Sequence, residues 1–204
     1  EKIPKDAAIS IRSVTRKGSE RIVRAAFDFA RKNGRKKVTV VNKANVLRAT
    51  CGLFLEVARE VAKDYPDIEF DSANIDAICM WLIKNPLNYD VIVTTNLFGD
   101  ILSDLCSQLV GGMGFACSGN IGEKYAVFEP THGSASKYAG QYKVNPIASI
   151  LAAKMMLDWL GETDRANILY QAVKEVIVES KIKTYDMGGS DSTIDMAKAI
   201  AAKL

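Results

Sequence analysis

Two aspartates, Asp100 and Asp104, have the residue type and the spacing of metal ligands. They follow a strand-like apolar run at residues 89–94, in a segment whose pattern favours a helix beginning near Leu97. Residues four apart in a helix share one face, so both carboxylates could approach one cation. Hard carboxylate oxygens favour Mg²⁺ or Mn²⁺. The alternative is that both are first-turn acids favoured by the helix dipole.

A third carboxylate and a lysine strengthen the metal hypothesis. Asp76 follows a strand-like stretch and would head a helix, where its alternative role is an N-cap. Lys43 lies between a predicted strand and a predicted helix, a position that borders the crevice at the strand ends of an α/β sheet. Most lysines are solvated surface charges. A cation nearby would favour the neutral amine and so suit Lys43 to proton abstraction.

The segment from Glu129 to Gly140 indicates a different chemistry. It contains His132, the only histidine of the chain, which excludes multi-histidine metal sites. Its small residues would let a ligand approach backbone N–H groups, and Lys137 beside Tyr138 offers a charge and a stacking face suited to a phosphorylated nucleotide. The alternative is an ordinary loop followed by a short exposed helix.

The composition excludes several classes of function. The 204 residues are 48% apolar and 25% charged, as in ordinary globular domains. A dispersed net charge of +3 argues against nucleic-acid binding. No apolar run reaches the roughly 18 residues of a membrane span, and no signal-peptide pattern opens the chain. The four cysteines lack metal-site spacing, which predicts free buried thiols in a reducing cytoplasm.

Apolar periodicity predicts the elements that must position these residues. Helices are predicted at 19–31, 44–63, 76–84, 99–110, 145–160, 163–180 and 192–204, and strands at 37–41, 68–71 and 91–93. The alternation predicts a layered α/β fold with at least partly parallel strands. The glycines at 111–114 predict a boundary between two lobes. They are not a dinucleotide fingerprint, because they follow a helix and Cys117 replaces the third glycine.

Five motifs, in this order, resemble those of the β-decarboxylating dehydrogenases, the family of isocitrate, isopropylmalate and homoisocitrate dehydrogenases. They are Val41–Asn45, Asp76, Asn96–Asp104, Gly119–Gly122 and Phe128–Ala135. The resemblance extends over essentially the whole chain. It implies the layered α/β fold of that family, with a small, dimer-forming domain at 1–110 and the C-terminal part of a large, cofactor-binding domain at 111–204.

The resemblance implies that a 2-hydroxy-3-carboxy acid is oxidised with NAD or NADP and then loses CO₂. It implies that Asp100 and Asp104 bind Mg²⁺ or Mn²⁺ in their own subunit, while Asp76 and Lys43 reach into the active site of a partner subunit. The cation would favour the substrate alkoxide and then the enolate. A homodimer with shared active sites follows. Residues implied to lie near the substrate or cofactor are Asn45, Asn96 and Glu129.

The resemblance also implies a cofactor loop. His132 would lie against the adenine and Gly133, Ser134 and Ala135 near the phosphates, and the remaining cofactor residues would be Lys137, Tyr138, Val144, Asn145, Tyr185 and Asp186. Relatives that prefer NAD usually carry Asp-Ile at 137–138, whereas a lysine suits the 2′-phosphate of NADP. NADP is therefore expected, with NAD as the alternative. Gly189, where NADP-isocitrate enzymes can place an arginine, favours that alternative.

The chain has no counterpart of the family's substrate-binding arginines or catalytic tyrosine. We therefore expect the N-terminal part of the large domain to be missing and the 204 residues alone to have negligible activity. The leading expectation is the C-terminal portion of a cytoplasmic, NADP-dependent isocitrate dehydrogenase of the tricarboxylic acid cycle. The alternatives are an NAD-dependent 3-isopropylmalate or homoisocitrate dehydrogenase, and a non-catalytic regulatory subunit or inactive fragment. Retention of Lys43 and the three aspartates argues against a regulatory role.

Overall fold

The computed structural model describes residues 6–204 of the chain. The chain divides into two compact units, one ending at Ser103 and the other running from Asp104 to Leu204. The division falls within a helix, α4 (Asn96–Leu109), ahead of the glycine-rich segment at 111–114. The roles assigned above to residues 1–110 and 111–204 stay predictions. Within the described residues, no helix is both long and apolar enough to span a membrane.

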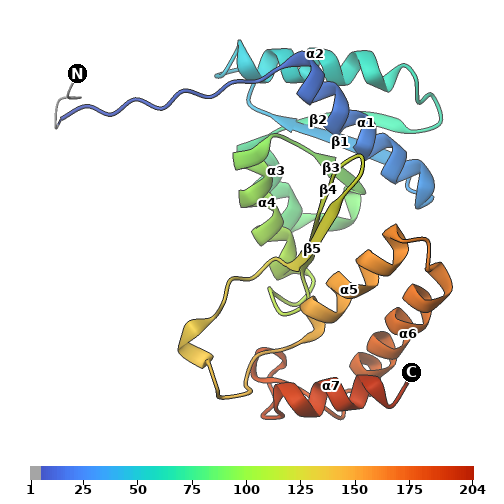
Figure 1. The fold of residues 1–204 in the computed structure, drawn as a ribbon. Helices are drawn as coiled ribbons and strands as arrows, with labels where there is room; N and C mark the ends of the chain where they lie inside the picture. The colour runs from blue at the N-terminus through green and yellow to red at the C-terminus, as the bar shows by residue number, and fades with distance from the viewer. Residues whose placement is uncertain (1–5) are drawn as a thin grey trace. The chain divides into compact units, whose positions relative to one another are not determined.

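The first unit is an α/β layer structure. Its elements are α1 (Arg16–Lys32), β1 (Lys37–Asn42), α2 (Thr50–Ala62), β2 (Glu69–Asn74), α3 (Ile75–Lys84), the short 3₁₀ helix η1 (Pro86–Asn88), β3 (Val91–Val93) and the first half of α4. The strands pair in parallel in the order β2-β1-β3. Figure 1 shows α1 and α2 on one face of this sheet and α3 on the other. The predicted layered α/β fold with parallel strands is confirmed.

The central strand β1 explains the layering. All its residues after Lys37 are buried, as expected for a strand that is covered on both faces. Because side chains alternate along a strand, Val38 and Val40 share one face and pack in the same cluster as Phe27 of α1 and Phe54 of α2. Phe27 and Phe54 are almost fully buried. This cluster fixes the sheet whose strand ends carry the first candidate residues.

The start of α2 corrects the sequence-based prediction. The periodicity placed a helix from residue 44, but α2 begins at Thr50. The buried Asn42 accepts a hydrogen bond from the Ala44 backbone N–H through its side chain, at 2.9 Å. Such local side-chain bonds compete with helix formation. The Lys43 carbonyl then accepts from the N–H groups of Val46 and Leu47, so residues 43–49 form turns.

The second unit combines a β-hairpin with helices. Its elements after α4 are β4 (Cys117–Ile121), β5 (Ala126–Pro130), the 3₁₀ helix η2 (Ser136–Tyr138), α5 (Ile147–Trp159), α6 (Thr163–Glu179), the 3₁₀ helix η3 (Tyr185–Met187) and α7 (Thr193–Ala201). β4 and β5 pair antiparallel. α5, α6 and α7, orange to red in Figure 1, enclose a core that includes Ile147, Val173 and Met196. The periodicity did not predict β4, whose sequence Cys-Ser-Gly-Asn-Ile carries few strand-forming residues.

Candidate functional site

Lys43 and Asp76 meet at one end of the parallel sheet. The Lys43 ammonium donates to the Asp76 carboxylate, with Nζ and Oδ1 2.5 Å apart. Lys43 directly follows β1 and Asp76 is the second residue of α3, which follows β2. Because the last residues of β1 and β2, Asn42 and Asn74, are paired in register, both strands deliver their next side chains to the same edge. The sequence placed each residue at a strand end, and the structure brings them together.

The two partners differ in exposure. The Lys43 side chain is 22% exposed, whereas that of Asp76 is 67% exposed. Hydrogen bonding from Lys43 is the main cause that lowers the pKa of Asp76, with backbone N–H groups at the start of α3 contributing. Asp76 is therefore ionised at neutral pH and open to solvent. Its N-cap interpretation is wrong, since the N-cap of α3 is Asn74.

The second candidate group lies on α4. Asp100 and Asp104 are both exposed and are separated by one turn of this helix. α4 has no acidic residue in its first turn, so the helix-dipole interpretation does not account for them. Among the described residues, neither carboxylate makes an ion pair. Two uncommitted carboxylates at this spacing fit a hard divalent cation.

The remaining acidic candidates do not gather around this pair within the chain. Among residues 6–204, no group of three or more His, Cys, Asp or Glu side chains could hold a metal ion. Asn45 is exposed in the turn after Lys43, and Asn96 is exposed as the first residue of α4. The Glu129 carboxylate, on β5, accepts a hydrogen bond from Asn120 of β4 at 3.1 Å.

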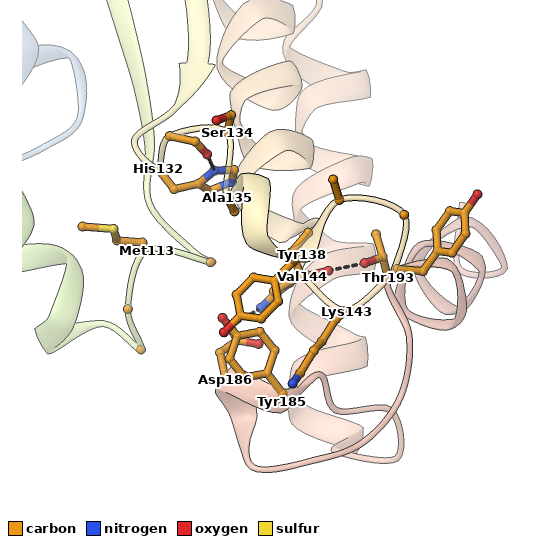
Figure 2. A pocket seen from close by; sticks show the side chains of 18 of the residues that line it. Met113, His132, Ser134, Ala135, Tyr138, Lys143, Val144, Tyr185, Asp186 and Thr193 are labelled. Atoms are coloured by element: carbon orange, nitrogen blue, oxygen red, sulfur yellow. Dashed lines mark hydrogen bonds between the residues drawn. The ribbon is translucent and has the colours of Figure 1, made fainter.

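A cavity of about 650 Å³ in the second unit gathers most of the predicted cofactor residues. This size is that of a typical small-molecule site. The predicted residues that line it are His132, Gly133, Ser134, Ala135, Tyr138, Val144, Asn145, Tyr185 and Asp186. Lys137, also predicted, is not among the lining residues, whereas Lys143, which was not predicted, is one of them. Figure 2 shows His132, Ser134 and Ala135 at one end and Tyr138, Lys143, Tyr185 and Asp186 at the other.

One end of the pocket, which carries His132, Ser134 and Ala135 and is called the histidine end below, is built from turns. His132 Nδ1 lies 2.8 Å from the carbonyl oxygen of Gly133. Because a carbonyl oxygen only accepts, Nδ1 carries the proton in this arrangement and Nε2 is left as an acceptor. Ala135 takes the left-handed conformation with φ of 46° and starts η2. A non-glycine residue in this conformation is uncommon and is held there by the surrounding structure.

The other end of the pocket, which carries Tyr138, Lys143, Tyr185 and Asp186 and is called the tyrosine end below, combines aromatic rings and positive charge. The rings of Tyr138 and Tyr185 are 5.5 Å apart and tilted by 50°. Hydrogen bonding from Lys137 is the main cause that lowers the pKa of the Tyr138 hydroxyl. Loss of solvent, with the contact to Tyr138, raises the pKa of Tyr185. Phenol hydroxyls and lysine ammonium groups are suited to hydrogen-bond an anion here.

Asp186 is held by two side-chain hydrogen bonds at the tyrosine end of the pocket. Its carboxylate accepts from Asn145 Nδ2 at 3.0 Å and from the Thr184 hydroxyl at 2.5 Å. Gly114 makes this possible, because a Cβ at that position would lie 2.5 Å from the Asp186 carboxylate. Asn145 in turn accepts from the Ile147 backbone N–H at the start of α5. Polar groups that were assigned separately from the sequence therefore form one connected network.

Comparisons with known proteins show the family of the chain. The model of the isocitrate/isopropylmalate dehydrogenase family matches residues 1–200. The chain is 52% identical over 199 residues to the 3-isopropylmalate dehydrogenase of Archaeoglobus fulgidus, and 52% identical over 200 residues to the homoisocitrate dehydrogenase of Methanocaldococcus jannaschii. A crystal structure of isocitrate dehydrogenase from Methylococcus capsulatus matches with a TM-score of 0.95 at 52% identity. The chain belongs to the isocitrate/isopropylmalate dehydrogenase family.

Family membership confirms the resemblance on which the sequence analysis relied. The three alignments each cover 98% of this chain, but 61%, 57% and 59% of the respective relatives. The chain thus spans less than two thirds of the length of these dehydrogenases. The signal that could have revealed Lys143 was its place beside Val144 and Asn145, both predicted cofactor residues. As an isolated lysine in a loop, it was indistinguishable from a solvated charge.

Proposed function

We propose that the chain is part of a metal-dependent dehydrogenase that converts isocitrate to 2-oxoglutarate and CO₂ with NADP. The observation that carries this proposal is the tyrosine end of the pocket, where Tyr138, Lys143 and Tyr185 surround a position suited to a phosphate. An enzyme that uses NAD commonly holds a ribose hydroxyl with an acidic side chain. The acidic side chain here, Asp186, is already bonded to Asn145 and Thr184.

In this proposal the cofactor occupies the cavity of the second unit. His132 would lie against the adenine, and the backbone of residues 133–135 would hold the phosphates. Gly133 supports this placement, because no atom lies within 4 Å of the position its Cβ would take. NADP bound there would accept a hydride from the substrate carbon. Thr193 stabilises the opposite wall, since its hydroxyl donates to the Val144 carbonyl.

The chemical step is assigned to the residues of the strand ends and of α4. Asp100 and Asp104 supply two carboxylates for Mg²⁺ or Mn²⁺, which would stabilise negative charge on the substrate oxygen. Lys43 takes part in removal of the proton from the substrate hydroxyl. The 2.5 Å contact with Asp76 orients the Lys43 side chain, and Asp76 adds a third carboxylate. We place Lys43 and Asp76 in the active site of a partner subunit.

A homodimer is part of this proposal. α3 and the turn after it expose large apolar side chains, with Met80 57%, Ile83 69% and Leu87 97% exposed. Apolar side chains gathered on one helix favour a protein interface. We expect analytical ultracentrifugation of the wild type to give a dimer, and Ile83→Asp to give a monomer. A monomeric wild type would contradict the shared-site assignment.

The test of the reaction uses the protein expressed from its complete reading frame. Isocitrate, 3-isopropylmalate and homoisocitrate are each supplied with Mg²⁺ and with either NADP or NAD, and formation of the reduced nicotinamide is followed. We expect the highest kcat/KM with isocitrate and NADP, and loss of activity on chelation of the metal. A higher kcat/KM with either other acid would reject the isocitrate assignment.

A second candidate is an NAD-dependent 3-isopropylmalate or homoisocitrate dehydrogenase. Relatives named for these two substrates are as similar to the chain as the isocitrate dehydrogenase structure is, at 52% identity each. Gly189 also favours NAD, as noted above. A regulatory subunit is less consistent with the chain, because Lys43, Asp76, Asp100 and Asp104 are all retained. We infer a cytoplasmic location from the free cysteines.

A further inference from the structure

The loop at residues 183–191 cannot supply a cation from position 189. A Cβ on Gly189 would lie 2.1 Å from the carbonyl oxygen and 2.7 Å from the carbonyl carbon of Lys183. Both atoms are backbone, and the Lys183 carbonyl also accepts a hydrogen bond from the Asp191 N–H at 2.9 Å. No side chain, and therefore no arginine, fits at 189 with this backbone. Positive charge for an anion at the tyrosine end must come from elsewhere.

Two lysines lie close to the tyrosine rings, and they are oriented differently. Lys137 places its ammonium 4.8 Å from the centre of the Tyr138 ring and does not line the pocket. Lys143 lines the pocket and places its ammonium 5.4 Å from the Tyr138 ring and 5.1 Å from the Tyr185 ring. Figure 2 shows its amine beside the Tyr185 ring. Only Lys143 therefore bridges both rings from inside the pocket.

The ammonium of Lys143 is also available to bind an anion. Its contacts are to the faces of two rings, which attract a cation but do not neutralise its charge. In the part of the chain that the structure describes, no carboxylate lies within ion-pair distance of Lys143. Lys137, by contrast, places its ammonium over the Tyr138 ring and does not line the pocket.

We propose that Lys143 provides the main positive charge that binds the 2′-phosphate of the nucleotide and so determines the preference for NADP over NAD. Lys137, whose ammonium lies over the Tyr138 ring and does not line the pocket, contributes less. A phosphate monoester carries a charge near −2 at neutral pH, so a charge-assisted hydrogen bond from Lys143 adds to those from the two phenols. This inference rests on the proposed function, in that it assigns the cavity to a nucleotide.

The test separates the 2′-phosphate from the rest of the nucleotide. The protein expressed from its complete reading frame is titrated with adenosine 2′,5′-bisphosphate and with 5′-AMP in a calorimeter. We expect the wild type to bind the bisphosphate more tightly than 5′-AMP. Lys143→Gln should weaken bisphosphate binding roughly 10–100-fold, the loss expected for one charge-assisted hydrogen bond, and should weaken 5′-AMP binding far less. Lys143→Arg should restore much of the difference.

Two variants serve as controls. Lys137→Gln removes the neighbouring lysine, and we expect a loss of only a few-fold. Lys174→Gln removes the same charge from an exposed position on α6 outside the pocket, and should leave both affinities at the wild-type values. Lys143 is exposed, so its replacement should leave the circular dichroism spectrum and Tm unchanged.

The outcomes distinguish this inference from the proposed function. If the wild type prefers the bisphosphate but Lys143→Gln keeps the same preference, or if Lys137→Gln loses as much, the assignment to Lys143 is wrong while NADP use stands. If the wild type binds both nucleotides equally, then both the NADP assignment and the role of Lys143 are wrong. A loss confined to Lys143→Gln and to the bisphosphate supports the inference.

Discussion

The proposed cofactor pocket and the Lys43–Asp76 pair differ in how much of each site one chain provides. The pocket has its walls, its polar network and its aromatic end within one compact unit, and its residues bond to one another. Lys43 and Asp76 form an exposed pair with each other, while Asp100 and Asp104 project from α4 without ion-pair partners in the described chain. Under the proposed function, nucleotide recognition would be preformed, whereas the reactive groups would need a substrate, a metal and a second subunit to complete them.

The largest expected effect is on kcat when Lys43 is replaced, with nucleotide binding left unchanged. Replacing Lys43 with Met should lower kcat by about 10²–10⁴-fold, the usual contribution of a general acid–base group. Binding of adenosine 2′,5′-bisphosphate should stay at the wild-type affinity, because the pocket residues are untouched. Lys63→Met, an exposed lysine after α2, is the matched control and should retain activity. A kcat for Lys43→Met within a few-fold of wild type would remove Lys43 from the chemistry.

Metal binding is the next test of the incomplete site. Asp104→Asn keeps the shape of the side chain but removes its charge, so the Mn²⁺ concentration for half-maximal activity should rise at least about 10–100-fold, the loss seen for outer ligand partners. Asp164→Asn, in the first turn of α6, removes an acid that interacts only with a helix dipole and should leave this concentration unchanged. An equal response of the two variants would contradict the metal assignment.

If the pocket is preformed, a substitution in the loop beside Tyr185 should lower the stability of the protein. Gly189→Ala should destabilise the protein by about 1–3 kcal/mol, because the added methyl group overlaps the Lys183 backbone. Thermal unfolding followed by circular dichroism measures the fall in Tm. Gly133→Ala is the control, since no atom lies within 4 Å of the position that its methyl group would take, and its Tm should match the wild type. Equal Tm values for both variants would show that the loop adapts.

The smallest expected effect concerns the exposed ion pair. Because the pKa of Asp76 is lowered below its usual value of 3.8, its contribution to stability is present above that value and lost as the pH falls through the folded-state pKa. Asp76→Asn should therefore lower Tm slightly near neutral pH and not at all in strong acid. A double-mutant cycle with Lys43→Met should show coupling only at the higher pH. Coupling that persists in acid would contradict the ion pair as its source.

Much of this arrangement could be predicted from the sequence because it depends on local pattern. A short run of β-branched residues identified β1, and Lys43 was predicted to lie between this strand and the next helix. The periodicity missed the late start of α2, because a buried Asn42 side chain bonds the backbone and delays the helix. It also missed Lys143, since its distinguishing feature is contact with two rings, one of them 42 residues away in the chain. Tertiary contacts of this kind leave no periodic signal.

The six-residue pairing of β1 with β2 sets the separation of Lys43 and Asp76. The pairing runs from Lys37 with Glu69 to Asn42 with Asn74, and it sits over a buried core. A slip of one residue would turn the apolar side chains of a strand to its other face. The separation of Lys43 and Asp76 is therefore inherited from the packing of the sheet. A change in the length of the connection between α2 and β2 would leave this separation unaltered as long as the register is kept.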